Sequence, residues 1–153
     1  MNENAHLLSC VIIPMGESQL LLPNVSIAEV VDYARIEPRE SMPDWLAGDL
    51  EWRGLTLPAL AYDAANGSPR PAAEGSRSRI AILNTISDQQ QAQPFIALVT
   101  QGIPSQIRVT RNQIRAVEGD TGPADLMLVD IEGEAVRIPN LDYLESLARE
   151  AAH

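Results

Sequence analysis

Short apolar segments recur along the whole chain, and turn-forming residues separate one from the next. Ten such segments can be distinguished. Many short strands at this spacing are typical of an antiparallel barrel or sandwich, so the sequence predicts a mainly β fold. The predicted strands are His6–Ile13, Gln19–Leu22, Leu50–Trp52, Leu55–Leu60, Ile80–Ile86, Phe95–Val99, Ile107–Val109, Ile114–Val117, Leu126–Ile131 and Glu134–Ile138.

A short internal helix is predicted over residues 25–34, where the sequence reads VSIAEVVDYA. Ser26 is followed three residues later by Glu29, which is the spacing of a capping box at a helix N-terminus. The apolar residues that follow recur at helical spacing and are expected to face the core. They are Ile27, Val30 and Val31.

A second helix is predicted to close the chain over residues 139–153, with Asn140 as its N-cap and apolar residues at helical spacing after it. Between Asp63 and Ser78 the chain is rich in Gly, Ser, Pro and Ala, and four of the predicted strands precede this segment while six follow it. We therefore expect a boundary between two half-domains at this segment.

The segment Asp49–Leu60 is predicted to form a β-hairpin with its corner at Arg53-Gly54. Gly54 can adopt a positive φ without steric cost, which a tight hairpin turn requires. Alternation along the first strand places Leu50 and Trp52 on one face, toward the core. The outward side chains of that strand and its corner are Asp49, Glu51 and Arg53.

The charge of the chain limits its partners. Eleven basic and twenty-one acidic residues give a formal net charge of −10, which disfavours nonspecific attraction to nucleic acid or to an anionic membrane surface. The 45% content of hydrophobic residues is sufficient for a folded core. We therefore expect protein or small-molecule partners, no nucleic acid and no direct membrane insertion.

Cys10 is the only cysteine, so the chain has no intrachain disulfide and no cysteine-based zinc site. It lies in an apolar alternating segment, which predicts a buried, inert thiol. The first residues carry no positive charge before an apolar run that is too short to span a membrane, so no signal peptide is predicted. These features indicate a reducing, cytoplasmic environment.

The case for an enzyme rests on Asp49 and Glu51, which share one strand face as the two carboxylates of a hydrolase would. The alternative is a solvated strand face whose charges are partly balanced. His6 and His153 lie near the chain ends, where a catalytic base would be poorly positioned. The sequence also has no Gly-x-Ser-x-Gly elbow and no phosphate-binding glycine loop. We therefore assign no catalytic, cofactor-binding or metal-binding residue.

Two further groups of charged residues are explained by solvent exposure. The segment QIRVTRNQIR at 106–115 concentrates arginines but has no interleaved aromatic residues, so it is interpreted as a solvated hairpin. From Glu118 to Glu134 the charged residues are all acidic, but their spacing is not that of a calcium loop. Strand-linking loops account for them.

The order of these elements resembles that of the CheW-type coupling proteins of bacterial chemosensory arrays. That family has an Ile/Val-x-Glu-Val/Ile element followed by Gly-x-x-Asn-Leu-Arg-Gly-x-x-x-Pro-x-x-Asp. The match runs without gaps from about Leu20 to Ala61, and a weaker likeness extends it over residues 7–150. Matching positions are Ile27, Glu29, Gly48, Arg53, Gly54 and Pro58.

The chain departs from the family pattern at three places. Glu51-Trp52 stands where the family has Asn-Leu, Ala61 replaces the aspartate after the proline, with Asp63 two residues on, and Val99-Thr100 replaces Val-Asp. Such divergence fits an accessory coupling protein, for instance in a chemosensory system that governs type IV pilus (twitching) motility.

The resemblance implies a single domain over residues 1–153, built of two five-stranded β-barrel half-domains at about 15–65 and 78–138. The terminal strand and helix would pack across them. It also implies a noncatalytic cytoplasmic adaptor at receptor arrays, which joins a methyl-accepting chemoreceptor to the regulatory domain of a CheA-type histidine kinase. A small-ligand-binding or hydrolytic β-barrel domain remains the alternative.

The family also implies which residues bind each partner. Arg53 is expected to lie close to Glu29 and to tie the hairpin corner to the short helix, although Glu29 would otherwise serve only the Ser26 cap. The receptor is expected in an apolar groove between the half-domains, and the kinase at the exposed hairpin corner. The alternative is that the apolar residues at both places belong to the core. The expected receptor-binding residues are Ile27, Glu29, Arg53 and Val99, and the expected kinase-binding residues are Gly54, Leu55 and Thr56.

Overall fold

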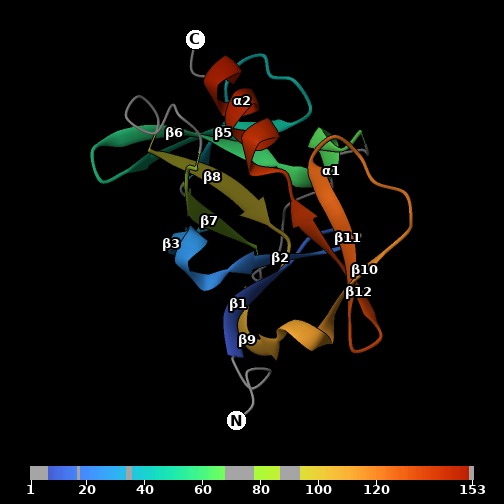
Figure 1. The fold of residues 1–153 in the computed structure, drawn as a ribbon. Coiled ribbons are helices and arrows are strands. Elements are labelled where there is room, and N and C mark those ends of the chain that lie inside the picture. The colour runs from blue at the N-terminus through green and yellow to red at the C-terminus, as the bar shows by residue number, and fades with distance from the viewer. Residues whose placement is uncertain (1–6, 17, 34–35, 68–77, 87–93, 152–153) are drawn as a thin grey trace.

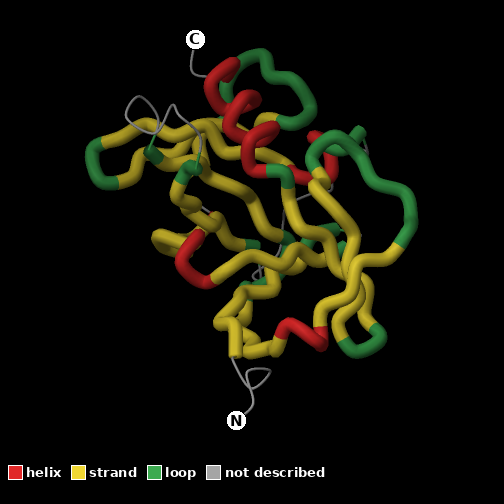
Figure 2. The backbone as a smooth tube through the Cα atoms, viewed as in Figure 1, coloured by secondary structure: helices red, strands yellow, loops and turns green. Residues whose placement is uncertain are grey.

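The computed structural model describes residues 7–16, 18–33, 36–67, 78–86 and 94–151. Within these ranges strands make up most of the backbone, and all helical segments except α2 are short (Figures 1 and 2). The strands are β1 (Leu7–Pro14), β2 (Gln19–Pro23), β3 (Ile27–Asp32), β4 (Ile36–Glu37), β5 (Leu46–Trp52), β6 (Leu55–Ala61), β7 (Arg79–Asn84), β8 (Phe95–Thr100), β9 (Ser105–Thr110), β10 (Ile114–Val117), β11 (Asp125–Ile131) and β12 (Glu134–Pro139). The helices are α1 (Tyr62–Ala65) and α2 (Leu141–Ala151), and the 3-10 turns are η2 (Asn24–Ser26) and η4 (Arg111–Gln113).

These strands form two six-stranded sheets. Sheet A has the order β10-β11-β12-β2-β1-β9, and sheet B has the order β3-β7-β8-β6-β5-β4. Read from β4, sheet B repeats the topology of sheet A, because an antiparallel three-stranded unit (β4–β6 or β10–β12) pairs in parallel with a strand from the other half of the chain. The fold is therefore an internal repeat in which each half of the chain lends two strands to the other sheet.

This exchange of strands bears on the boundary that was predicted between Asp63 and Ser78. Strands from both sides of it lie in each sheet, since β1 and β2 join β9–β12 while β7 and β8 join β3–β6. The segment separates the two chain halves and not the two sheets. The half-domain bounds at about 15–65 and 78–138 stay a prediction.

All ten predicted strands are present, and they include every strand of sheet A. In sheet B the sequence predicts β5 to β8 but not β3 and β4, which is why five strands per half were expected and six are found. β4 has only two residues, so it carries no periodic pattern. β3 was not predicted as a strand because its residues were interpreted as a helix.

The internal helix predicted over residues 25–34 is wrong, because Ile27–Asp32 is strand β3, paired antiparallel with β7. Burial alternates along this strand, and Ile27, Glu29 and Val31 lie on its less exposed side. Because a charged residue, Glu29, lies on that side and an apolar one, Val30, on the exposed side, the apolar residues fall at the spacing of a helix. The expected cap at Ser26 is also wrong, since η2 begins after Pro23 and has no side-chain cap bond.

The core joins both sheets and α2. One apolar cluster includes Ile13 and Leu20 of sheet A, Leu60 and Leu98 of sheet B, and Leu144 of α2, all fully buried. The predicted C-terminal helix is confirmed with its N-cap, because the Tyr143 backbone N–H donates to the Asn140 side chain at 3.2 Å. α2 packs on β6 at the top of Figure 1. No helix among the described residues is long and apolar enough to cross a membrane.

Candidate functional site

The hairpin between β5 and β6 turns at Arg53-Gly54, as predicted. Arg53 has a φ of 51° and Gly54 a φ of 80°, and Trp52 and Leu55 face each other across the turn. Two successive positive φ values are the signature of the tight two-residue turn that matches the twist of the flanking strands. Here this geometry projects the corner away from the sheet, on the left-hand side of Figure 1.

The two faces of the hairpin are as alternation predicts. Leu50 and Trp52 are 0% and 5% exposed, whereas Glu51 and Arg53 are exposed. On β6, Leu57 and Ala59 are buried, while Leu55 at the corner is 38% exposed. The corner therefore presents one apolar side chain beside a charged one.

The proposed hydrolytic carboxylates are already bound to neighbouring side chains. Asp49 accepts two hydrogen bonds from the Arg39 guanidinium, each of 2.8 Å, and Glu51 accepts one of 2.6 Å from the Thr56 hydroxyl. A bidentate ion pair with Arg39 and a hydrogen bond along the strand face are contacts typical of a charge-balanced surface. The interpretation of this strand face as balanced and solvated is confirmed.

Glu29 is the centre of the cluster that joins β3 to the hairpin. Its Oε1 accepts a hydrogen bond of 2.9 Å from Trp52 Nε1 and one of 3.1 Å from Arg53 Nη2. The Arg53 guanidinium also lies over the Trp52 ring, with Cζ 4.9 Å from the ring centroid. The expected contact between Arg53 and Glu29 is thus confirmed, but it anchors the corner to a strand and not to a helix.

Trp52 links this surface cluster to the core. Its indole is almost completely buried and packs edge-to-face on Phe95 of β8, with ring centroids 4.8 Å apart. Trp52 therefore holds the Glu29 carboxylate and the Arg53 guanidinium at the surface, while its own ring is fixed in the core beneath them. A leucine at this position, as in the family pattern, has no side-chain N–H to donate to Glu29.

The other expected binding residues differ in exposure, since some lie at or near the surface and one lies in the core. Ile27 is half-buried against the core at the start of β3, close in sequence to Glu29, and Gly54 and Thr56 are exposed at the corner. Val99 is not at an edge, because β8 pairs with β6 on one side and β7 on the other and the side chain is 4% exposed. Val99 thus supports the surface only from within the core.

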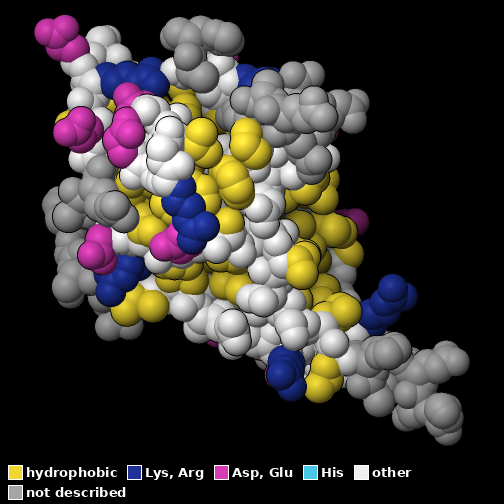
Figure 3. All heavy atoms as spheres, turned by 90° about the vertical axis from the view of Figure 1, so that its left-hand side faces the viewer, with side chains coloured by type: hydrophobic (Ala, Val, Ile, Leu, Met, Phe, Trp, Pro, Cys, Tyr) yellow, Lys and Arg dark blue, Asp and Glu magenta, His cyan; other side chains and the backbone are white. Residues whose placement is uncertain are grey.

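The face that carries β3 and the hairpin corner combines apolar and charged groups. Figure 3 views this side, and apolar side chains gather across its middle, with basic and acidic side chains next to one another beside them. Val30 on β3 is 40% exposed and Val25 on η2 is 82% exposed. Exposed aliphatic groups beside a fixed ion pair make a surface suited to a protein partner.

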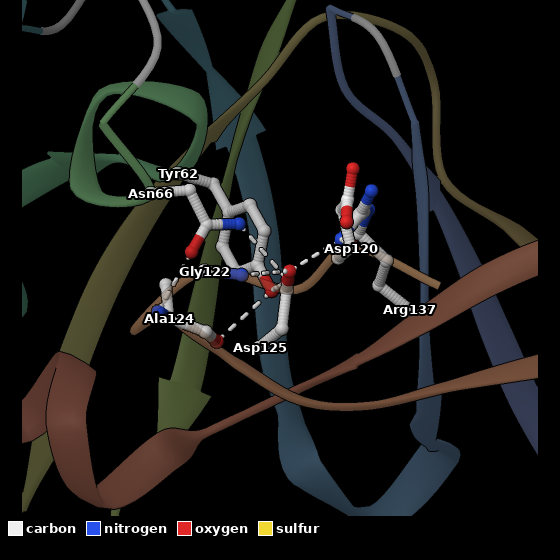
Figure 4. Close-up of polar contacts among 7 residues, drawn as sticks. All are labelled: Tyr62, Asn66, Asp120, Gly122, Ala124, Asp125 and Arg137. Carbon is white, nitrogen blue, oxygen red and sulfur yellow. Dashed lines mark hydrogen bonds and ion pairs between the residues drawn. The ribbon is translucent and has the colours of Figure 1, made fainter. Parts of the chain in front are cut away.

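A second polar cluster lies where α1 meets sheet A, around the fully buried Asp125 side chain. The Tyr62 hydroxyl and the Arg137 guanidinium both bond to its carboxylate, together with Asn66 Nδ2 at 2.9 Å and the Gly122 backbone N–H at 3.0 Å. Figure 4 shows these groups converging on Asp125. The cluster joins the end of the first chain half to the hairpin of the second.

This environment changes the acid–base properties of both partners. Burial alone would raise the pKa of Asp125, but the hydrogen bonds from Tyr62, Gly122 and Asn66 and the positive charge of Arg137 together lower it. The pKa of Tyr62 is raised by its burial and by its bond to Asp125. A buried carboxylate with this many hydrogen-bond donors stabilises the contact between α1 and sheet A, so we interpret the Asp125 cluster as structural.

Sequence reasoning missed this cluster, because it assigned the acidic residues after Glu118 to loops. Two of the family departures also have structural roles. Thr100 is fully buried, accepts the Arg79 backbone N–H at 3.1 Å and donates to the Gly102 carbonyl at 2.7 Å. Asp63 accepts the Gly16 backbone N–H at 3.0 Å. Among the described residues no group of three or more His, Cys, Asp or Glu side chains is arranged to hold a metal ion.

Comparison with known proteins agrees with this architecture. The family model for the CheW-like domain matches residues 9–147. No curated protein matches the chain. A solved structure with a similar fold is the scaffolding protein TtCheW from Thermoanaerobacter tengcongensis, with a TM-score of 0.72 and 17% sequence identity, covering 92% of this chain and 89% of that chain.

Proposed function

The chain belongs to the CheW-like domain family, a family of noncatalytic scaffolding proteins, and on this premise we propose that it couples chemoreceptors to a CheA-type histidine kinase. The hydrolytic alternative is wrong, since the family is noncatalytic and both candidate carboxylates are bound to neighbouring side chains. A small-ligand site at the same carboxylates loses its support for the same reason. The proposed adaptor acts in the cytoplasm, at receptor arrays near the inner membrane.

The observation that carries this proposal is the fixed position of Arg53. Its side chain is 70% exposed, yet a hydrogen bond to Glu29 and the face of the Trp52 ring hold the guanidinium in place. A cation held in one orientation binds a partner's acceptor with a smaller loss of side-chain entropy than a free one. Glu29 and Arg53, with Ile27 beside them, form the proposed receptor surface.

The kinase surface is proposed at the hairpin corner, Gly54-Leu55-Thr56. Leu55 is accessible before binding, as an interface anchor must be, and it continues from the rigid turn at Arg53. Glu51 bonds Thr56 across the corner, so the family departure at position 51 adds a carboxylate to this surface. We expect this charge to alter which kinase is bound.

The departures also support an accessory role within chemosensory signalling. Trp52 places a second donor on Glu29 where the family pattern has leucine, and Thr100, which stands where the pattern has aspartate, makes two hydrogen bonds. Selectivity for a dedicated receptor and kinase, for instance those of a system that governs type IV pilus motility, is the proposed result. Deletion of the gene should then alter twitching motility.

Calorimetric titration tests the proposed function. Purified protein is titrated with the regulatory domain of its cognate kinase and, separately, with the cytoplasmic hairpin tip of its cognate receptor. We expect saturable binding to both. Binding to neither, by protein shown to be folded by circular dichroism, would contradict the adaptor role.

A further inference from the structure

A second exposed apolar surface lies on sheet A, on the side of the molecule away from the hairpin corner (Figure 1). Val117 of β10 is 40% exposed, and Leu126 and Met127 of β11 are 62% and 38% exposed. Val117 faces Leu128 across the two strands, and a β-bulge between Asp125 and Met127 interrupts the alternation of β11 so that Leu126 and Met127 are both exposed. We define Val117, Leu126, Met127 and Leu128 as the β10–β11 patch.

The patch is hollowed rather than flat. Residues 116–121 and 126–128 line a shallow open depression. The loop after β10 forms one wall of it, and Gly119 lies so close to Leu128 that a Cβ there would come within 2.5 Å of Leu128 Cδ2. Glycine at this position thus permits an approach of the loop to Leu128 that a larger residue would prevent.

The internal repeat shows that the fold does not require an apolar residue at position 128. The hairpins β5–β6 and β11–β12 have the same corner, since Arg53-Gly54 and Glu132-Gly133 both have positive φ. Leu128 precedes the Glu132-Gly133 corner by the same number of residues as Asp49 precedes the Arg53-Gly54 corner, so the two residues occupy equivalent positions in the repeat. In sheet B that position is Asp49, whose carboxylate forms an ion pair with Arg39 and whose side chain is 27% exposed.

The charges around the depression indicate what binds there. Glu118 and Asp120 are exposed in its wall, and Arg137, which pairs with Leu128 on the neighbouring strand β12, already bonds Asp125 and the Asp120 carbonyl. The whole chain has a net charge of −10, which opposes a second copy and an anionic membrane alike. Apolar anchors with an acidic rim complement a cationic amphipathic segment.

We propose that the β10–β11 patch is a docking site for a basic amphipathic segment of a partner protein. Leucine-like side chains of that segment occupy the depression over Leu126 and Leu128, and its lysine or arginine side chains meet Glu118 and Asp120. The patch is separate from the Arg53 corner, so both surfaces are accessible in one molecule. This proposal does not depend on which receptor or kinase the corner binds.

The test uses the full chain and two synthetic twelve-residue probe peptides. One has leucines at helical spacing with lysines between them, and the other has glutamates in place of the lysines. Leu126→Ser removes the most exposed anchor of the patch, and Ile86→Ser is the matched control because Ile86 is 61% exposed elsewhere on the surface. Affinity is measured by fluorescence anisotropy at low and at physiological salt.

We expect the lysine peptide to bind the wild type and the Ile86→Ser variant equally, and to bind the Leu126→Ser variant about tenfold more weakly, as for loss of one interface anchor. The glutamate peptide should not bind. Equal binding of the lysine peptide to all three proteins would overturn the proposal, because it would show attraction by net charge alone. Self-association of the wild type that Leu126→Ser abolishes, without peptide binding, would assign the patch to a second copy and also overturn it.

Discussion

Trp52 and Glu29 are 23 residues apart in sequence, and the Trp52 indole donates a hydrogen bond of 2.9 Å to the Glu29 carboxylate. The same carboxylate oxygen accepts from Arg53, so a residue buried in sheet B and a residue at its exposed corner share one acceptor. The indole orients the carboxylate, and the carboxylate orients the guanidinium. This chain of contacts connects the core of sheet B to the proposed receptor surface.

Trp52→Phe should lower the free energy of unfolding by about 1–3 kcal/mol, because it removes a partly buried hydrogen bond and some core volume. Trp45→Phe is the control, since Trp45 is a half-buried tryptophan that packs against the core. Urea denaturation of both variants measures the difference. An equal loss in the two variants would show that the bond to Glu29 adds no stability.

Arg53→Glu should weaken receptor binding strongly, since it places a like charge beside Glu29 where the partner meets a cation. Stability should change little, because an exposed ion pair contributes only about 0–1 kcal/mol. Arg111→Glu makes the same charge change at an exposed position on η4. Binding lost equally in both variants would indicate a general charge effect, and a large fall in Tm for Arg53→Glu alone would indicate a structural role.

Leu55 and Leu57 provide a matched pair on one strand face. Leu57→Ala should destabilise the fold by about 2–5 kcal/mol because the side chain is buried, whereas Leu55→Arg should leave Tm nearly unchanged and weaken kinase binding. Titration with the kinase regulatory domain and thermal unfolding measure the two effects. Undiminished kinase binding by folded Leu55→Arg would remove the corner from the interface.

Asp125 should make the fold sensitive to acid. Its pKa in the folded state is below the ordinary value of 3.8, so its contribution to stability is complete above that value and is lost as pH falls through the folded-state pKa. Tyr62→Phe removes a hydrogen bond that lowers this pKa, so we expect a loss of about 1–3 kcal/mol at neutral pH and a smaller further loss in acid.

The measurement is the free energy of unfolding between pH 7 and pH 2.5, obtained by urea titration at each pH. Tyr143→Phe is the control, since Tyr143 is a half-buried tyrosine on α2 that packs against the core. Parallel acid profiles for wild type and Tyr62→Phe would show that Asp125 does not gain stability from the tyrosine hydroxyl.

Local patterns predict most of the fold, and they fail where tertiary contacts break the pattern. The corner at Arg53-Gly54 is predictable because glycine and alternation are both local signals. The helix expected at Ile27 is wrong because Glu29 lies on the less exposed side of β3 and Val30 on the exposed side, which puts the apolar residues at helical spacing. The sequence leaves a groove position and a core position open for Val99, and the place of β8 between β6 and β7 decides for the core.

The candidate site divides in the same way. The contact between Glu29 and Arg53 follows from the family resemblance, whereas the indole bond from Trp52 depends on how β3 and β5 lie in space. The Asp125 cluster draws its members from segments about sixty residues apart, as the 63-residue separation of Tyr62 and Asp125 shows. Nothing in the local sequence distinguishes this aspartate from the solvated ones nearby.

The adaptor role is tested most directly by a sedimentation assay with vesicles that carry the cognate receptor. Kinase, receptor vesicles and the purified chain are mixed, and the kinase in the pellet is measured with wild type, with Arg53→Glu and without the chain. We predict that kinase sediments only when the wild-type chain is present, and that folded Arg53→Glu retains little of it. Kinase that sediments equally in all three mixtures would contradict the proposed coupling function.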